Sequence, residues 1–279
     1  MSEAAAHRFG IVQGRLTESP PGELQWFPQA AWREEFSTAQ SLGIDYIELI
    51  AEVAHNPDNP IWSDSGVKEI IDLVHAHGMS VHAVCNDFIV GHSLIDDSEV
   101  LPQNIRLIER ARILGTEKYV LPLFDASELT PDNQLDYVPA IQTIADEAND
   151  VGMITCLETI LTGPELITLL NRIDRPHVAA VYDTGNRVAF GHDLAGDIRL
   201  LGERIAHVHI KDKNAANENV LLGTGLVNFD SVFQALRDIA YDGPYTFETF
   251  RGCDPLRTAT YNMQVVNFFH GNAERMTYG

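Results

Sequence analysis

The sequence predicts one α/β domain over residues 1–279, folded as a single (β/α)8 barrel of the TIM-barrel class. Short apolar runs rich in β-branched and aromatic residues alternate with amphipathic stretches along the chain, as expected for parallel strands that are covered on both faces. There are eight such runs, and about 35 residues for each strand with its helix is the size of one unit of a closed barrel. An open doubly wound sheet usually has a glycine-rich turn after its first strand, whereas the corresponding segment Gln13–Leu16 contains one glycine.

The expected strands are the apolar runs themselves. They are Phe9–Val12, Ile44–Ile50, Val81–Cys85, Tyr119–Leu123, Met153–Leu157, Val178–Tyr182, Ile205–Ile210 and Tyr245–Phe247. Apolar residues at three- and four-residue spacing predict helices between the runs, most clearly at Trp32–Leu42, Val100–Leu114, Asp132–Val151 and Phe229–Ile239. Several glycines shortly before strands are expected to end helices in the left-handed conformation, because glycine has no Cβ. They are Gly43, Gly78, Gly115, Gly152 and Gly202.

The net charge of the chain excludes some classes of partner. Lys and Arg number 19 against 40 Asp and Glu, which gives a formal net charge of −21. Such a surface repels phosphate backbones, so neither nucleic acid nor an anionic membrane surface is an expected partner. No apolar run approaches the ~20 residues that span a bilayer, and the N-terminus has no apolar signal core. Three distant cysteines (Cys85, Cys156 and Cys253) fit reduced thiols, so we expect a cytoplasmic protein.

Function in such a barrel depends on side chains at the carboxyl ends of the strands. Four consecutive expected strands end in or near an acid or a histidine, namely Glu158, Asp183, His209 and Glu248. Their spacings of 25, 26 and 39 residues place them side by side around the barrel mouth. A single acid of this kind usually caps the next helix. Three buried carboxylates, however, need a cation, and carboxylates with one imidazole suit one divalent metal ion, manganese, magnesium or cobalt, with zinc an alternative.

The motifs around these residues resemble those of the xylose-isomerase-like barrels, a superfamily of metal-dependent sugar isomerases and epimerases. Its members include ketose 3-epimerases, inosose isomerases and dehydratases, hydroxypyruvate isomerases and apurinic endonucleases. Similar segments cover nearly the whole chain, at residues 10–16, 42–49, 157–158, 183–186, 207–212, 223–229 and 241–248. The resemblance implies that Glu158, Asp183, His209 and Glu248 bind one divalent ion, with Mn²⁺ expected first. It also implies that Glu158 and Glu248 act as the acid/base pair.

The implied reaction starts when a metal ion holds the carbonyl and a neighbouring hydroxyl of the substrate and stabilises the enediolate left by proton removal. Return of the proton from the opposite face gives an epimerase, and its return to the neighbouring carbon gives an isomerase. Expulsion of a β-substituent gives a dehydratase, a deglycosidase-like enzyme or another lyase. We therefore expect an isomerase or epimerase of a ketose, cyclitol ketone or sugar phosphate, with a lyase as the alternative. A non-catalytic sugar-binding barrel fits less well, because a binder has no use for two opposed bases.

Further polar residues follow the strands. Asn186 stands where many relatives have histidine, and its amide can hydrogen-bond a sugar hydroxyl but ligates metals poorly. Together with the charge, Asn186 favours one metal ion and no role in DNA repair.

Arg15, Lys211 and Arg251 are expected near the mouth, where they either bind the substrate, including a phosphate, or neutralise the carboxylates. Glu48 at the end of the second expected strand is expected to orient a ligand or the substrate. The expected partner is a small-molecule sugar or polyol ketone, and the sequence leaves open whether the chain forms a homo-oligomer.

Overall fold

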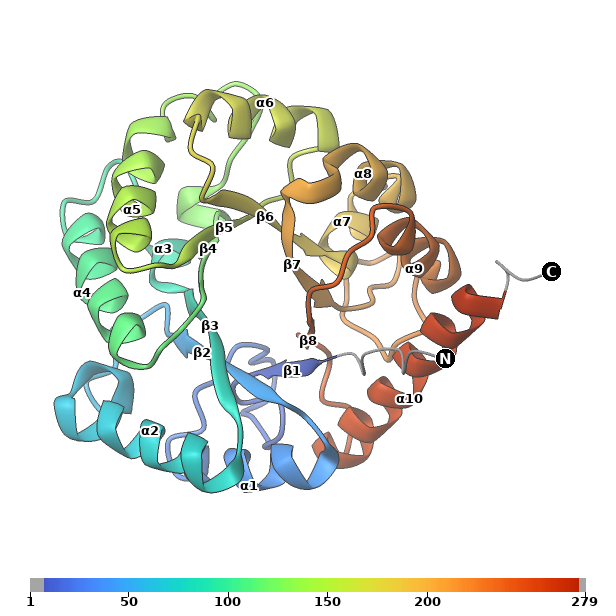
Figure 1. Ribbon diagram of the computed structural model, residues 1–279, viewed down its shortest axis with the longest axis horizontal. Helices are drawn as coiled ribbons and strands as arrows, with labels where there is room; N and C mark the ends of the chain where they lie inside the picture. The colour runs from blue at the N-terminus through green and yellow to red at the C-terminus, as the bar shows by residue number, and fades with distance from the viewer. Residues whose placement is uncertain (1–7, 276–279) are drawn as a thin grey trace.

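The computed structural model describes residues 8–275 and confirms the predicted barrel (Figure 1). Eight strands pair in parallel with their chain neighbours, and β1 pairs with β8 to close the sheet. The strands are β1 Phe9–Val12, β2 Tyr46–Ala51, β3 Ser80–Asn86, β4 Lys118–Pro122, β5 Ile154–Glu158, β6 Val178–Asp183, β7 Ile205–Ile210 and β8 Tyr245–Phe247.

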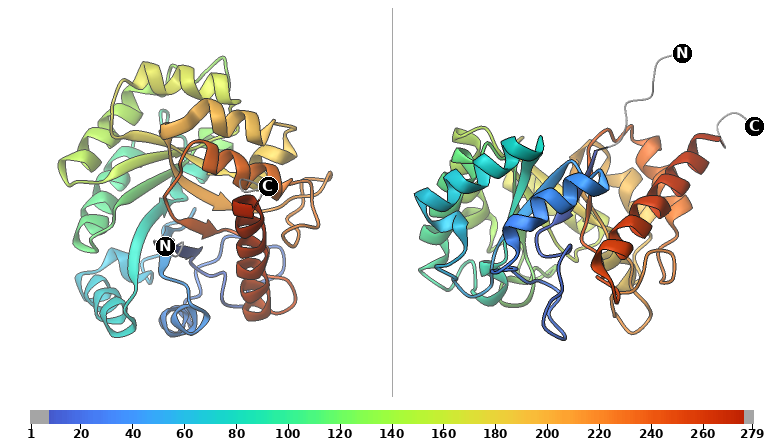
Figure 2. Two further views of the ribbon diagram at one scale, coloured as in Figure 1. Left: turned by 45° about the vertical axis from the view of Figure 1, so that its right-hand side comes forward. Right: turned by 90° about the horizontal axis from the view of Figure 1, so that it is seen from below.

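Helices surround the barrel and connect successive strands (Figures 1 and 2). The α-helices are α1 Trp32–Leu42, α2 Asp64–His77, α3 Phe88–Gly91, α4 Val100–Ile113, α5 Val138–Asp150, α6 Gly163–Ile173, α7 Thr184–Ala189, α8 Leu194–Leu201, α9 Phe229–Asp238 and α10 Pro255–Arg275. Short 3-10 helices are η1 Pro60–Trp62, η2 Asp125–Ser127 and η3 Gly202–Arg204. Within residues 8–275, none of these helices has the length and apolar character to cross a membrane.

Local sequence signals explain several helix boundaries. Before α6, Glu165 accepts a hydrogen bond from the Thr162 backbone N–H at 2.8 Å as part of a capping box. Before α9, the side chain of Asn228 accepts from the backbone N–H of Ser231 at 3.2 Å, which satisfies a free donor of the first turn. Gly43 ends α1 with φ 78° and ψ 29°, in the left-handed region where a Cβ is unfavourable.

Most strand and helix ends lie within one residue of those expected, but one helix and one strand begin later and one glycine has another conformation. The helix expected from Asp132 begins at Val138, because residues 132–137 form turns and Pro139, which has no backbone N–H, stands in the first helical turn. Strand β2 begins at Tyr46 rather than Ile44. The five expected glycines all have positive φ, but Gly202 has ψ −129° and so lies outside the left-handed helical region.

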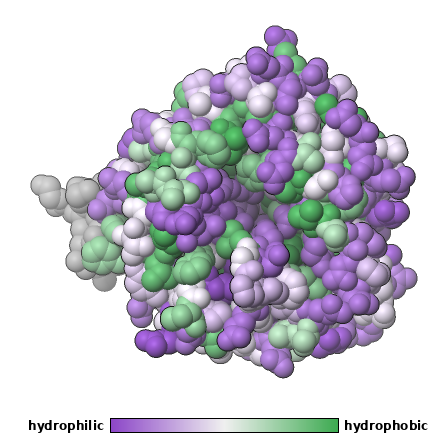
Figure 3. Space-filling model, turned by 180° about the vertical axis from the view of Figure 1, so that it is seen from behind, coloured by the Kyte–Doolittle hydropathy of each residue, from purple (hydrophilic) through white to green (hydrophobic). Residues whose placement is uncertain are grey.

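The strands are buried on both faces, as the continuous apolar runs predict. Outside the barrel, Phe36, Phe229 and Phe233 belong to the core between the sheet and the helices. Inside it, the Tyr46 hydroxyl lies 2.6 Å from the Thr246 hydroxyl, and His207 is fully buried. Side chains therefore fill the barrel, and the space for a ligand is at its carboxyl end, where Figure 3 shows a hollow near the centre of the molecule.

Candidate metal centre and substrate cavity

Four strand-end side chains converge at the barrel mouth. Glu158 ends β5, Asp183 ends β6, His209 lies near the end of β7 and Glu248 follows β8. All four are buried, and one ligand atom from each lies within 4.8 Å of the others. The parallel register explains the convergence, since Asp183 pairs directly with His209 on the neighbouring strand.

The donor atoms of this cluster fit a divalent metal ion. Asp183 Oδ2 and Glu248 Oε2 are buried, and the Lys211 ammonium group lies 3.1 Å and 2.6 Å from them. His209 Nδ1 is also buried without a hydrogen bond. It lies 3.3 Å from Glu248 Oε2 and 3.7 Å from Glu158 Oε2. Converging carboxylate oxygens with a buried imidazole nitrogen are a donor set that such an ion takes.

Glu48 orients the histidine of this cluster. Its Oε1 lies 3.2 Å from His209 Nε2, and its Oε2 lies 2.7 Å from His207 Nε2. The side chain of Glu48 is fully buried, which opposes its charge, but the two imidazoles outweigh burial and hold the pKa of Glu48 below its usual range. Because Glu48 engages Nε2, the Nδ1 of His209 faces the carboxylates.

The two glutamates of the cluster have opposite electrostatic environments. Burial raises the pKa of Glu158, and this effect exceeds the opposing attraction of His209. Glu248 is also buried, but Lys211 and His209 hold its pKa well below the usual range. Asn186 donates a hydrogen bond to Glu158 Oε1 at 3.0 Å and accepts one from Lys211 at 3.4 Å. A pair of carboxyl groups with separated proton affinities is the arrangement that proton transfer uses.

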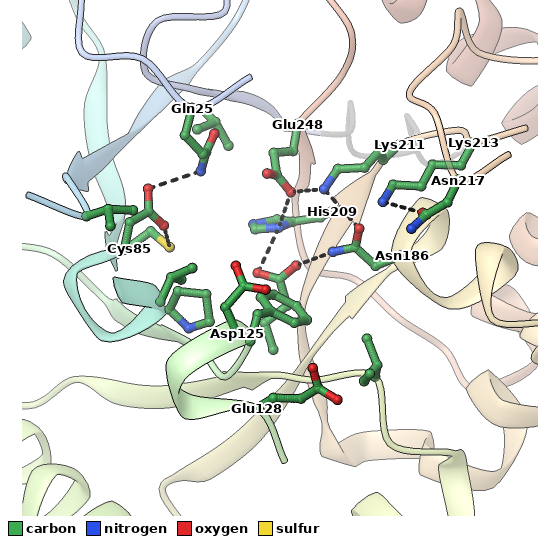
Figure 4. A pocket seen from close by; sticks show the side chains of 18 of the residues that line it. Gln25, Cys85, Asp125, Glu128, Asn186, His209, Lys211, Lys213, Asn217 and Glu248 are labelled. Carbon is green, nitrogen blue, oxygen red and sulfur yellow. Dashed lines mark hydrogen bonds and ion pairs between the residues drawn. The ribbon is translucent and has the colours of Figure 1, made fainter. Parts of the chain in front are cut away.

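A cavity of about 320 Å³ opens over the cluster (Figure 4), a volume typical of a small-molecule site. Glu48, Glu158, His209 and Glu248 line its floor together with Asn186 and Lys211. Apolar side chains complete the wall, and they include Val12, Val53, Val90, Phe124, Ile160 and Phe190. The cluster of candidate metal ligands and the cavity are therefore one site.

The two arginines expected at the mouth do not line this cavity. Arg15 is buried, and its Nη2 donates to Gln25 Oε1 at 2.5 Å and to Glu248 Oε1 at 3.4 Å. Arg251 donates from Nε to the Gly14 carbonyl at 2.7 Å and from Nη1 to the Leu24 carbonyl at 2.8 Å. Arg251 therefore holds the loop between β1 and α1, and we assign neither arginine a contact with the substrate.

The cavity is also lined by polar residues that were not selected from the sequence, among them Gln25, Asp87, Asp125 and Glu128. Asp87 directly follows β3, and Asp125 follows β4 after two residues. The strand-end rule that identified Glu158 and Asp183 could therefore have identified both. Gln25 lies in the long β1–α1 loop, where no local pattern marks it.

Comparison with known proteins identifies the family. A sequence model of the family described as "Xylose isomerase-like TIM barrel" matches residues 36–267. The chain belongs to this family. Among its curated relatives is the L-ribulose 3-epimerase of Methylomonas sp. (strain DH-1), 27% identical over 238 residues, which cover 79% of each chain. Another is the L-ribulose-5-phosphate 3-epimerase UlaE of Escherichia coli (strain K12 / DH10B), 23% identical over 78% of this chain and 81% of the relative.

The family fold is also found in solved structures. The one described as "Structure of L-ribulose 3-epimerase" aligns with a TM-score of 0.78 and 18% identity, covering 98% of this chain and 97% of the other. At this identity the match shows the shared fold alone. The named epimerases among the curated relatives agree with the expectation of a sugar epimerase or isomerase.

Proposed function

We propose that this chain is a divalent-metal-dependent ketose epimerase that transfers a proton between Glu158 and Glu248. The observation that carries the proposal is the position of His209 Nδ1 between these two buried glutamates, 3.7 Å from Glu158 and 3.3 Å from Glu248. Glu158 ends β5 and Glu248 directly follows β8, so β6 and β7 separate the two glutamates around the barrel. Oxygen atoms of one bound sugar can reach the cluster while each glutamate approaches the sugar from its own side.

The proposed ligands are Glu158, Asp183, His209 and Glu248, and oxygen with imidazole donors fits Mn²⁺, Mg²⁺, Co²⁺ or Zn²⁺. When bound, the ion polarises the carbonyl and hydroxyl oxygens of the sugar and so makes the neighbouring C–H more acidic. One glutamate then removes the proton from the carbon beside the carbonyl. The other glutamate supplies a proton from the opposite side, which inverts that carbon.

Two further residues act on the sugar oxygens in this proposal. Asn186 donates to Glu158 Oε1 and lines the cavity, so it can position Glu158 and bind a hydroxyl group. The Lys211 ammonium lies 2.6 Å from Glu248 Oε2, so it can donate to a sugar oxygen while keeping Glu248 ionised. The names of the curated relatives favour epimerisation over loss of water from the same starting point.

The test is solvent isotope exchange. Protein loaded with Mn²⁺ is incubated in D₂O with a panel of ketoses, and products are analysed by NMR and mass spectrometry. We expect an epimer that carries one deuterium at the inverted carbon, and loss of the reaction after metal removal with EDTA. The variant Glu203→Gln, in η3 before the amino end of β7, serves as a control with unchanged activity. Products lighter by one water, or full turnover in protein shown by elemental analysis to contain no metal, would contradict the proposal.

A further inference from the structure

The cavity has an acidic side that the proposed reaction does not use. Asp87, Asp125 and Glu128 line it, and they come from the segments that follow β3 and β4. Lys211 and Lys213, which follow β7, lie on a different side of the same cavity (Figure 4). The acidic side is therefore available to the part of a substrate that extends away from the metal cluster.

Asp87 is the buried member of this side. Asp87 is 2% exposed, its Oδ2 accepts from Gln25 Nε2 at 3.2 Å, and its Oδ1 accepts from the Cys85 thiol at 3.4 Å. None of the arginines and lysines that the structure describes forms an ion pair with it. The amide of Gln25 and the thiol of Cys85 hold the Asp87 side chain at the cavity wall.

Asp125 and Glu128 are exposed at the cavity edge. Neither carboxylate has a hydrogen-bond or ion-pair partner within the described part of the chain. The backbone of Asp125 has φ 45°, a conformation that favours glycine, although aspartate adopts it more readily than most residues. The Glu128 backbone N–H donates to the Asp125 carbonyl at 3.1 Å and closes the turn that presents both carboxylates.

The cations of the cavity are already engaged. Lys211 contacts Asp183 and Glu248. Lys213 donates to Asn217 Oδ1 at 2.9 Å, in a loop fixed by the buried Asp212, which accepts from the Gly223 backbone N–H at 2.9 Å. Among the described residues, six carboxyl side chains and two lysines line the cavity. Asp125 and Glu128, in contrast, have no lysine or arginine partner within the described part of the chain.

Charge and hydrogen-bonding capacity lead to the same conclusion about the substrate. A phosphate ester carries about −1.5 to −2 charges at neutral pH and offers acceptor oxygens. Ionised carboxylates also offer only acceptors, so they form no hydrogen bond with the phosphate and repel it. Hydroxyl groups of a sugar donate to carboxylates. An acidic side with free acceptors therefore complements hydroxyl groups and opposes a phosphate.

We propose that Asp87, Asp125 and Glu128 make this cavity select an uncharged polyol ketone and reject its phosphate ester. This inference rests on the proposed function, because it concerns the substrate of the same site. Asp125 and Glu128 repel a charged phosphate at the cavity entrance. Further inside, Asp87 accepts hydrogen bonds from the hydroxyl groups of the substrate, and Gln25 donates to them. Lys213 alone does not compensate for the acidic side.

The experiment compares matched ligands that differ only in the phosphate, L-ribulose and L-ribulose 5-phosphate. Binding to the Mn²⁺-loaded protein is measured by calorimetry, and deuterium exchange is measured in parallel. We expect the neutral ketose to bind at least tenfold more tightly at low ionic strength, with a smaller difference at high salt because screening weakens repulsion. In the double variant Asp125→Asn/Glu128→Gln, we expect binding of the phosphate to improve at least fivefold relative to the neutral ketose.

A matched control removes the same charge elsewhere. Glu147 and Asp150 are exposed near the end of α5, which leads into the amino end of β5, so Glu147→Gln/Asp150→Asn should leave the preference unchanged. Tighter binding of the phosphate by the wild type, an unchanged preference in the Asp125/Glu128 variant, or failure of the neutral ketose to bind would overturn the inference. If deuterium exchange occurs but the neutral ketose is not preferred, the inference fails and the proposed function stands. If the neutral ketose binds selectively but no deuterium exchange occurs, only the proposed function is contradicted.

Discussion

Glu48 Oε1 lies 3.2 Å from His209 Nε2, and this contact turns His209 Nδ1 toward the carboxylates of Glu158 and Glu248. A buried carboxylate behind a ligating histidine fixes both the tautomer and the ring orientation. Glu48, which is fully buried inside the barrel, thus sets the orientation of a histidine in the candidate metal centre.

Replacement of Glu48 should weaken metal binding without removing a proposed ligand. In Glu48→Gln, the amide no longer supplies a charged acceptor to His209, so we expect metal affinity to fall by about 10–100-fold. Equilibrium dialysis with elemental analysis measures this affinity directly. The exposed-acid variant Glu203→Gln is the control, and unchanged affinity in Glu48→Gln would show that the contact does not tune the site.

Replacement of Lys211 should raise metal affinity, the opposite of the effect expected for Glu48. Its ammonium group contacts Asp183 Oδ2 and Glu248 Oε2, two atoms of the proposed ligand set. Lys211→Met keeps an unbranched side chain and removes the competing charge, so we expect tighter metal binding in calorimetry, together with lower kcat. Weaker metal binding in this variant would mean that Lys211 supports the ion rather than competes with it.

The two glutamates should be separable from Asp183 by their kinetics. Glutamine can still offer an oxygen but accepts no proton at neutral pH, so Glu158→Gln and Glu248→Gln should each lower kcat by at least about 10²–10⁴-fold. One of these variants should still exchange the substrate C–H proton with solvent through its remaining glutamate, without inverting the carbon. Asp183→Asn should lose activity mainly through weaker metal binding, which added Mn²⁺ partly restores. Near-wild-type turnover in either glutamine variant with metal bound removes both glutamates from the mechanism.

Glu35 should make stability depend on pH. It is buried and accepts from the Gly14 backbone N–H at 2.8 Å, and burial raises its pKa from 4.5 to about 7. As pH rises through this range, the unfolded chain releases the proton before the folded one does, so the free energy of unfolding falls by up to about 1.4 kcal/mol per pH unit. The contribution is fully present below pH 4.5 and lost above about pH 7.

The variant Glu35→Gln should reduce this slope, because its amide does not titrate and its oxygen can still accept from Gly14. Urea unfolding in EDTA between pH 4.5 and 8 measures the effect. The neighbouring exposed Glu34→Gln is the matched control on the same helix and should keep the wild-type slope. Equal slopes in all three proteins would place the proton uptake elsewhere.

Local patterns were sufficient for the strands and for four strand-end groups. Strands such as β1 and β7 begin and end where the apolar runs do, because strands buried on both faces need continuous apolar sequence. The chain order of the barrel then carries Glu158 and Asp183 to adjacent strand ends without any knowledge of distant contacts. Helix α5 was less predictable, since the apolar spacing continues into residues that form turns before Pro139.

The sequence by itself thus determined the closed barrel and the chemistry concentrated at its carboxyl end, because both follow from a repeat of about 35 residues. Only the tertiary structure decided how the remaining polar groups are used. Arg251 reaches carbonyls more than two hundred residues away in the chain, and Gln25 reaches Asp87 across 62 residues. Such contacts form only when the barrel closes, so no local pattern reports which cations are engaged and which carboxylates still face the cavity.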